Sequence, residues 1–140
     1  MTLGGRVAVL RDGALEQVAP PLDVYAKPVN TFVARFIGAP PMNLVPAALL
    51  AIDAPPGLLA GIRPQDVSLV ASGPVRAVVD LVEPRGHDYV LHLRLESPDA
   101  GPFMAVVAGG DPPAAGAQVA LSLPAERLHL FDAREGTRHR

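Results

Sequence analysis

The high proportion of glycine and proline is the feature that most limits how this chain can fold. The 140 residues include 13 glycines and 16 prolines, about a fifth of the whole. Both residue types interrupt helices and strands, so the chain is divided into short segments joined by turns. At 49% hydrophobic and 19% charged residues, the chain still has enough apolar material for a packed core. We therefore predict a folded domain built from short elements.

The composition excludes several classes of protein. The absence of cysteine excludes a disulfide framework, thiol catalysis and cysteine-ligated metals. A net charge of −2 with 4% aromatic residues argues against a nucleic-acid partner, which needs a basic surface and stacking rings. Residues 1–5 lack the basic region of a signal peptide, and no apolar stretch approaches the roughly 20 residues that cross a bilayer. We expect a cytoplasmic protein without membrane insertion.

The first part of the chain predicts a β-hairpin followed by a short helix. Residues 7–10 are wholly apolar, 11–13 carry turn chemistry, and 14–18 return to a strand-like pattern. An apolar run without polar alternation is typical of a strand buried in a larger sheet than this segment supplies. Pro20 and Pro21 suit the first turn of a helix that ends at Lys27 and Pro28.

A second short helix is predicted after Asn30, a favourable N-cap residue, with Gly38 as its stop. Its expected apolar face comprises Phe32, Val33, Phe36 and Ile37. Residues 39–45 then predict an extended linker into a second region.

From Gly61 onward the hydrophobic period becomes two, which indicates half-buried strands. In 75–82 the expected inward residues are Val75, Ala77, Val79 and Leu81. In 89–95 they are Tyr89, Leu91, Leu93 and Leu95, with His92 and Arg94 facing solvent. Further strands at 103–108 and 119–123, with single helical turns at 63–66 and 124–127, predict a small all-β barrel or sandwich. Residues 134–140 are expected to fray.

Motifs for catalysis are missing from this sequence. There is no phosphate-binding loop, since Lys27 is the only lysine and a proline follows it, and no G-x-S-x-G turn exposes a serine nucleophile. We expect solvated surface positions for the four histidines (His87, His92, His129 and His139) and no metal site. The stretch 83–86 suggests a local ion pair. No catalytic, cofactor-binding or metal-binding residue is predicted.

Five stretches taken together resemble one known family. They are residues 1–18, PLDVYAKPVNTFVARFIGAPPMNLVP at 21–46, GIRPQDV at 61–67, VDLVEPRGHDYVLHLRL at 79–95 and LSLPAERLHLFDAREGTR at 121–138. In this order they are similar to the ATP-binding subunits of sugar importers, of the maltose and glycerol-3-phosphate type of ATP-binding cassette (ABC) transporter. The similar region is the back end of those subunits, including their transport-associated OB (TOBE) regulatory domain.

The resemblance implies a mainly β fold. Residues 1–45 would be the C-terminal remnant of the ATPase domain, a hairpin plus two helices. Residues 46–140 would form a small OB-like TOBE barrel, related to molybdate-binding-protein barrels. In the family the Walker A, signature and Walker B motifs come earlier, so this chain would be non-catalytic. ATP and Mg would belong to the full-length protein.

The resemblance also implies partners and contact residues. The family's barrel pairs with its counterpart across a homodimer, and the full-length ATPase binds the transporter's membrane subunits at the cytoplasmic side of the inner membrane. The candidate inter-domain or dimer contacts are Phe32, Phe36, Arg63, Glu83, Glu126 and Arg127. Without their sheet, Val7, Val9, Phe32 and Phe36 would form an apolar patch, so we expect a homodimer or exchange of the N-terminal segment.

Departures from the family leave alternatives open. Gln65 replaces the usual glutamate, Arg85 stands where an aliphatic residue is common, and 45–61 is shorter than the family stretch that supplies early barrel strands. An incomplete barrel is therefore an expectation. One alternative function is a molybdate-type oxyanion-binding module, although hydroxyl residues are few. The other is a stand-alone adaptor.

Overall fold

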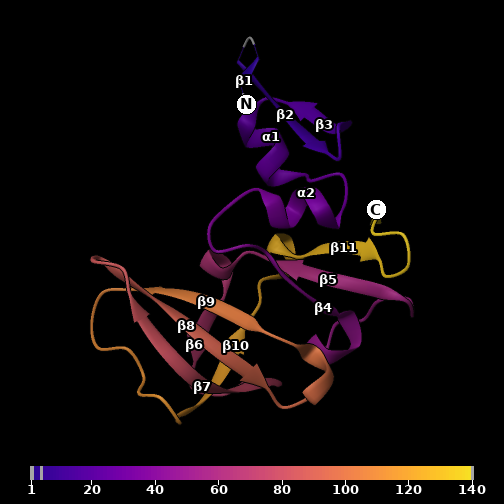
Figure 1. Cartoon of the computed structure of the whole chain (residues 1–140). Coiled ribbons are helices and arrows are strands. Elements are labelled where there is room, and N and C mark those ends of the chain that lie inside the picture. The colour runs from indigo at the N-terminus through magenta and orange to yellow at the C-terminus, as the bar shows by residue number, and fades with distance from the viewer. Residues whose placement is uncertain (1, 4, 140) are drawn as a thin grey trace.

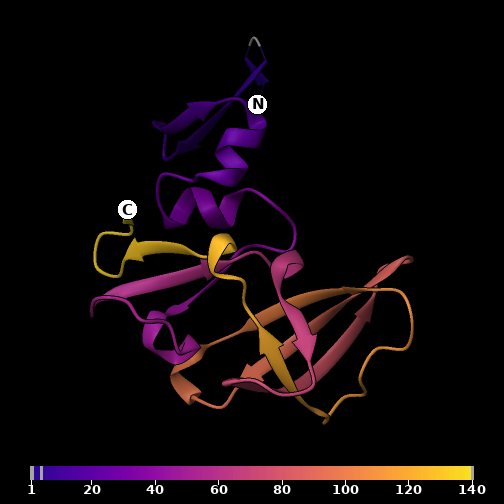
Figure 2. The same ribbon diagram turned by 180° about the vertical axis from the view of Figure 1, so that it is seen from behind.

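The computed structural model describes residues 2, 3 and 5–139, and its chain is mainly β, as predicted. Residues 1 and 4 of the predicted N-terminal unit and residue 140 of the predicted frayed tail lie outside this described part. Figures 1 and 2 show the N-terminal hairpin and the two helices, in indigo and purple, stacked above a larger body of strands. We call residues 2, 3 and 5–42 the N-terminal segment and residues 43–139 the β-rich unit.

The N-terminal segment contains a small antiparallel sheet and two helices. The strands are β1 (Thr2–Leu3), β2 (Arg6–Arg11) and β3 (Ala14–Ala19), and the helices are α1 (Pro21–Ala26) and α2 (Thr31–Phe36). The predicted hairpin is confirmed: β2 and β3 pair around Asp12 and Gly13, which both have positive φ (52° and 83°) as a tight two-residue turn requires. The predicted N-cap is also confirmed, because Asn30 Oδ1 accepts a 2.9 Å hydrogen bond from the Val33 amide.

The apolar face of α2 is only partly buried. Val33 packs with Val9 and Val24 in a small core, with Phe32 and Ile37 at its margin. Phe36, expected to face inward, is 62% exposed. This small core does not extend to Phe36. The Phe36 ring instead stacks on the Phe32 ring at a centroid distance of 5.6 Å.

The β-rich unit consists of two antiparallel sheets. The first has the order β6-β10-β7-β8-β9 and the second the order β12-β11-β5-β4. Their bounds are β4 (Asn43–Pro46), β5 (Leu58–Ile62), β6 (Ser68–Val70), β7 (Val75–Pro84), β8 (Asp88–Leu95), β9 (Phe103–Ala108), β10 (Gln118–Ser122), β11 (His129–Asp132) and β12 (Arg138–His139). Short 3₁₀ turns at Ala47–Leu50 (η1), Pro64–Asp66 (η2), Pro98–Ala100 (η3) and Ala125–Arg127 (η4) complete the unit, and they include both predicted helical turns.

The main core lies between the two sheets. Its buried residues include Val45, Ile62, Val79, Leu91, Phe103 and Leu121. The sheets are not closed by a continuous ladder, and a side chain joins them at one edge. Asn43 of β4 donates to the Met104 carbonyl (2.8 Å) and accepts from the Met104 amide (2.7 Å), as a neighbouring strand would. No helix among the described residues has the length and apolarity needed to span a membrane.

The predicted alternation in β7 is wrong beyond Val79. Val75, Ala77 and Val79 are buried as expected, but Leu81 is 55% exposed. The pairing of β7 with β8 shifts between Val79 and Leu81, so Asp80 is an extra residue opposite the β8 strand. Because one extra residue reverses which face later side chains occupy, Val82 rather than Leu81 packs against the core.

Two predicted irregular stretches are ordered instead. The expected linker at 39–45 ends in strand β4, which pairs with β5 from Asn43 onward. The tail expected to fray forms a hairpin in its described part, with β12 paired to β11. Asp132 Oδ1 accepts hydrogen bonds from the Arg134 and Glu135 amides, both 2.8 Å, and these bonds lower the pKa of the Asp132 carboxyl. The side chain thereby organises the connecting turn.

A glycine is required at position 61 by close packing. A Cβ there would lie 2.5 Å from Met42 Sδ and 3.2 Å from the Phe131 ring. We expect Gly61→Ala to lower the free energy of unfolding by about 1–3 kcal/mol through overpacking, as measured by urea denaturation. Gly73→Ala is the control, because its nearest contact would be an ordinary 3.4 Å. Equal stability of the two variants would contradict the packing argument.

Candidate interface between the N-terminal segment and the β-rich unit

A single buried arginine connects the two parts of the chain. Arg63 follows β5 directly, and only 1% of its surface is exposed. Its Nη1 donates to the carbonyls of Ala34 (2.8 Å) and Ile37 (2.6 Å), and its Nη2 donates to that of Tyr25 (3.1 Å). These carbonyls lie at the C-terminal ends of α2 and α1, where helices leave acceptors unpaired. Arg63 therefore caps both helices from the opposite side of the junction.

The surroundings of Arg63 fit a cation. The guanidinium lies over the Tyr25 ring, 4.2 Å from its centroid. Burial lowers the pKa of Arg63, while Tyr25 and Asp66 oppose that shift. The arginine side chain stays protonated even when it is buried. The three carbonyls and the Tyr25 ring therefore have to offset the free-energy cost of removing its charge from water. The Nε atom has no hydrogen-bond partner among the described residues.

An apolar cluster lies beside this polar contact. Ala34 of α2 and Met42 pack against Phe131 of β11, and all three are almost fully buried. Because the cluster draws on both parts of the chain, hydrophobic burial and the arginine contacts stabilise the same interface.

The C-terminal hairpin forms a second connection. The Thr31 amide donates to the Gly136 carbonyl (2.9 Å), and the Arg138 amide donates to the Val29 carbonyl (3.0 Å). Arg138 Nη1 also donates to the Pro28 carbonyl (3.2 Å) and contacts His129 Nδ1 at 3.1 Å. The N-terminal segment is thus joined to the β-rich unit through both Arg63 and the end of the chain.

His129 does not occupy the solvated position that was expected. It is half-buried, stacks on Phe131 at 6.4 Å and accepts the hydrogen bond from Arg138, which requires a neutral imidazole. Burial, assisted by the charges of Arg138 and Arg63, lowers the pKa of His129 to about 4. His129 is therefore part of the interface.

The remaining predicted contact residues lie apart from this junction. Glu83 is exposed and forms a 2.9 Å hydrogen bond with His92 across β7 and β8. Glu126 and Arg127 are exposed on the short turn η4. Phe32 and Phe36 line an open groove of about 580 Å³ beside Arg11, whose guanidinium lies 4.9 Å from the Phe32 ring centroid.

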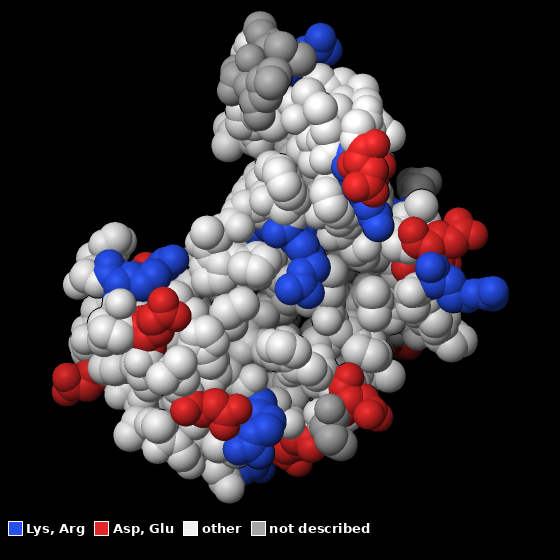
Figure 3. All heavy atoms as spheres, in the orientation of Figure 1, with Lys and Arg blue, Asp and Glu red and all other residues white. Residues whose placement is uncertain are grey.

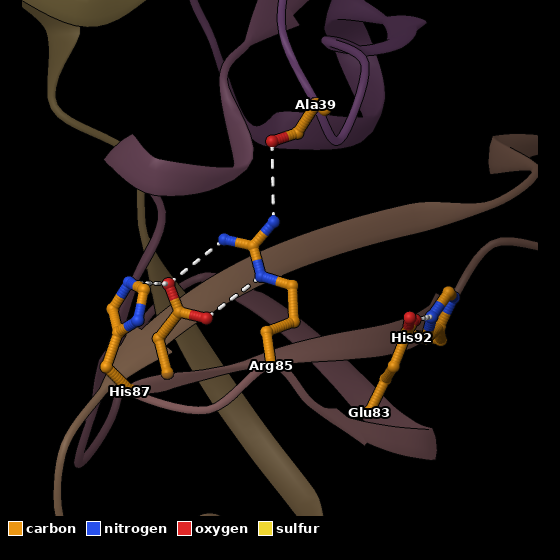
Figure 4. Close-up of polar contacts among 6 residues, drawn as sticks. Ala39, Glu83, Arg85, His87 and His92 are labelled. Carbon is orange, nitrogen blue, oxygen red and sulfur yellow. Dashed lines mark hydrogen bonds and ion pairs between the residues drawn. The ribbon is translucent and has the colours of Figure 1, made fainter.

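The ion pair expected within 83–86 has a different partner. Arg85, labelled in Figure 4, forms a bidentate pair with Asp88, with distances of 2.9 and 3.0 Å. These hydrogen bonds lower the pKa of Asp88. The tight β7–β8 turn brings residue 88 next to residue 85, whereas Glu83 points to the other side, toward His92. Arg85 also reaches the Ala39 carbonyl at 3.5 Å.

Exposed apolar residues are concentrated in the N-terminal segment. They are Leu10, Leu15, Val18, Leu22, Tyr25, Val29 and Phe36. Figure 3 shows charged side chains of both signs in small groups, with wide uncharged areas on the face in view. Among the described residues, no three histidine, aspartate or glutamate side chains converge as a metal site would require.

Comparison with known families identifies the β-rich unit. A family model described as the TOBE domain matches residues 60–131, just over half of the chain. The chain belongs to the TOBE-domain family. The match begins in β5 and ends in β11, so Arg63 is a residue of the TOBE domain that binds the helices outside it. The predicted division of the chain at residue 45 stays a prediction.

Curated relatives match almost the whole chain. The xylose/arabinose import ATP-binding protein XacK of Haloferax volcanii is 39% identical over 160 residues, which cover 97% of this chain and 42% of the relative. The sn-glycerol-3-phosphate import ATP-binding protein UgpC of Ruegeria pomeroyi is 38% identical, covering 99% and 43%. The UgpC of Salmonella paratyphi A is 36% identical, covering 99% and 44%. The resemblance to C-terminal regions of sugar-import ATP-binding proteins is confirmed, and the chain spans less than half of each relative.

Sequence reasoning selected Arg63 but missed Asn43, His129 and Arg138. The partners of Asn43 and Arg138 are 61 and 110 positions away in the chain, respectively, so no local pattern marks them. The only available signal was a polar residue within an apolar strand pattern, which holds for Asn43 and His129.

Replacement of the capping arginine tests the interface. Arg63→Met keeps much of the side-chain volume but leaves three carbonyls without their donor. We expect the free energy of unfolding to fall by about 2–4 kcal/mol, and amide exchange in α1 and α2 to accelerate more than in β7 and β8. Arg76→Met is the control, because the Arg76 side chain is 63% exposed. An equal loss in both variants would refute the capping role.

The interface histidine predicts a pH dependence of stability. Between pH 6.5 and about 4 the unfolded chain binds a proton at position 129 that the folded chain does not. The free energy of unfolding should therefore decrease as the pH is lowered from 7 to 4.5. His129→Gln should flatten this decrease in urea titrations, whereas His87→Gln, whose side chain is 91% exposed, should not. Parallel pH profiles for all three proteins would exclude the effect.

Proposed function

We propose that this chain is the non-catalytic regulatory and dimerisation region of an ABC import ATPase that energises uptake of a sugar or related solute. The family membership supports the TOBE assignment, and the names of the relatives support import ATPases as the class of protein. On this proposal ATP and Mg bind outside the residues of this chain. The homodimer and the transporter's membrane subunits are its partners, at the cytoplasmic face of the inner membrane.

The capping of α1 and α2 by Arg63 is the observation that carries this proposal. On the family resemblance, the two helices close the ATPase domain, and Arg63 belongs to the TOBE domain. Any tilt of the helices relative to the barrel must break hydrogen bonds to a buried cation, which is costly. Movement of the ATPase domain would therefore be transmitted to the TOBE domain as a rigid unit, as a regulatory and dimerising domain requires.

The exposed apolar residues support the same proposal. Leu10, Leu15 and Leu22 are 52%, 58% and 80% exposed on the hairpin and the first helix. Soluble proteins seldom leave such residues grouped without a covering partner. In a full-length ATP-binding protein the rest of the ATPase domain would supply that cover.

Self-association of the isolated chain tests the exposed surface. We expect light scattering to give a dimer or larger species, because the N-terminal apolar residues are buried by a second copy. The double variant Leu10→Ser with Leu22→Ser should shift the protein toward monomer, since it removes two of the most exposed apolar side chains. Leu81→Ser is the matched control, because Leu81 is 55% exposed on the β-rich unit.

Two results would contradict the proposal. A monomeric wild-type chain at all working concentrations would remove the argument for an uncovered surface. Sustained Mg-dependent phosphate release from ATP by the pure chain would show that it is not a non-catalytic region.

A further inference from the structure

A hollow in the β-rich unit, lined by residues of η1, β6 and β10 among others, has no role in the interface described above. It has a volume of about 580 Å³, within the range of small-molecule sites. Its floor consists of the core residues Leu50, Val75 and Leu121, which are 3%, 6% and 2% exposed. Residues of η1, β6, β10 and the region of η4 line it, so the hollow draws on segments that are far apart in the sequence.

Most of the residues that line this hollow are apolar. Val70 of β6 is 39% exposed here, and Leu128 closes another side. The hydroxyl groups are those of Ser72 and Ser122. An apolar floor with a few polar groups at the opening fits a ligand with a hydrophobic body and a polar head.

The charge at the opening selects the type of head group. Asp53 is the only charged residue among the lining residues, all of which belong to the described part of the chain. Its side chain is exposed, and it forms no ion pair with a lysine or arginine of the described part of the chain. A carboxylate beside an apolar surface favours a cation and disfavours an anion.

We propose that this hollow binds a small amphipathic cation, with an ammonium group at Asp53 and an apolar chain against Leu50, Val75 and Leu121. The ammonium group also has the Ser72 and Ser122 hydroxyl groups available as acceptors. Binding of such a cation does not depend on the proposed transport function. The proposed ligand has the opposite charge to the molybdate-type oxyanions that were the alternative ligands for this barrel.

Titration with n-octylammonium chloride below its micelle concentration tests the site. We expect saturable NMR shifts in the methyl groups of Leu50, Val70 and Leu121. Sodium octanoate, which has the same apolar chain and the opposite charge, should bind more weakly. Asp53→Asn should reduce octylammonium affinity about two- to fivefold, as expected for one exposed ion pair. Asp111→Asn, an exposed carboxylate that does not line this hollow, should leave the affinity unchanged.

A second variant tests the location without altering the core. Ser72→Phe places a large side chain at the exposed rim and should abolish the shifts, while the unfolding transition keeps its midpoint. Absence of saturable shifts in the wild-type chain would overturn the proposal. Equal affinity for octylammonium and octanoate, or no effect of Asp53→Asn, would overturn the assignment of a cationic ligand. Shifts that persist in Ser72→Phe would place binding elsewhere.

Discussion

The burial of the Arg63 guanidinium is the interaction on which the arrangement of this chain depends. A charge removed from water is stable only where acceptors replace its hydration, and here they are the last carbonyls of α1 and α2 with the ring of Tyr25. The helices gain in return, because their short length leaves most of their carbonyls without intrahelical partners. Each side of the junction therefore satisfies polar groups that the other side cannot satisfy alone.

This reciprocity makes the junction cooperative. If the helices separated from the β-rich unit, a buried cation and three carbonyls would lose their partners together, and the cluster of Ala34, Met42 and Phe131 would be exposed. The C-terminal hairpin adds backbone hydrogen bonds to residues 29 and 31 from the other side. The N-terminal segment is therefore held to the TOBE domain by contacts on two sides.

The surface of the molecule divides into two kinds of apolar region. The exposed leucines of the hairpin and first helix are apolar surface residues of the N-terminal segment, which suit a protein partner. The hollow above Leu50 and Leu121 is concave and has a single carboxylate at its rim, which suits a small ligand. The two regions lie on different parts of the chain and use no residue in common, so each can be occupied independently.

What the sequence determined by itself is the local structure. The turn at Asp12 and Gly13, the cap at Asn30, the helical turn after Arg63 and the strands from Gly61 onward depend on residues only a few positions apart, and the structure confirms them. The family resemblance selected Arg63 as a contact residue, without indicating what it would contact. Tertiary structure alone decided that Leu81 faces solvent, that His129 is neutral and half-buried, and that Arg138 and His139 form a strand paired with β11. These features depend on strand register and on partners up to 110 residues away, and residues that distant become neighbours only through packing of the whole chain.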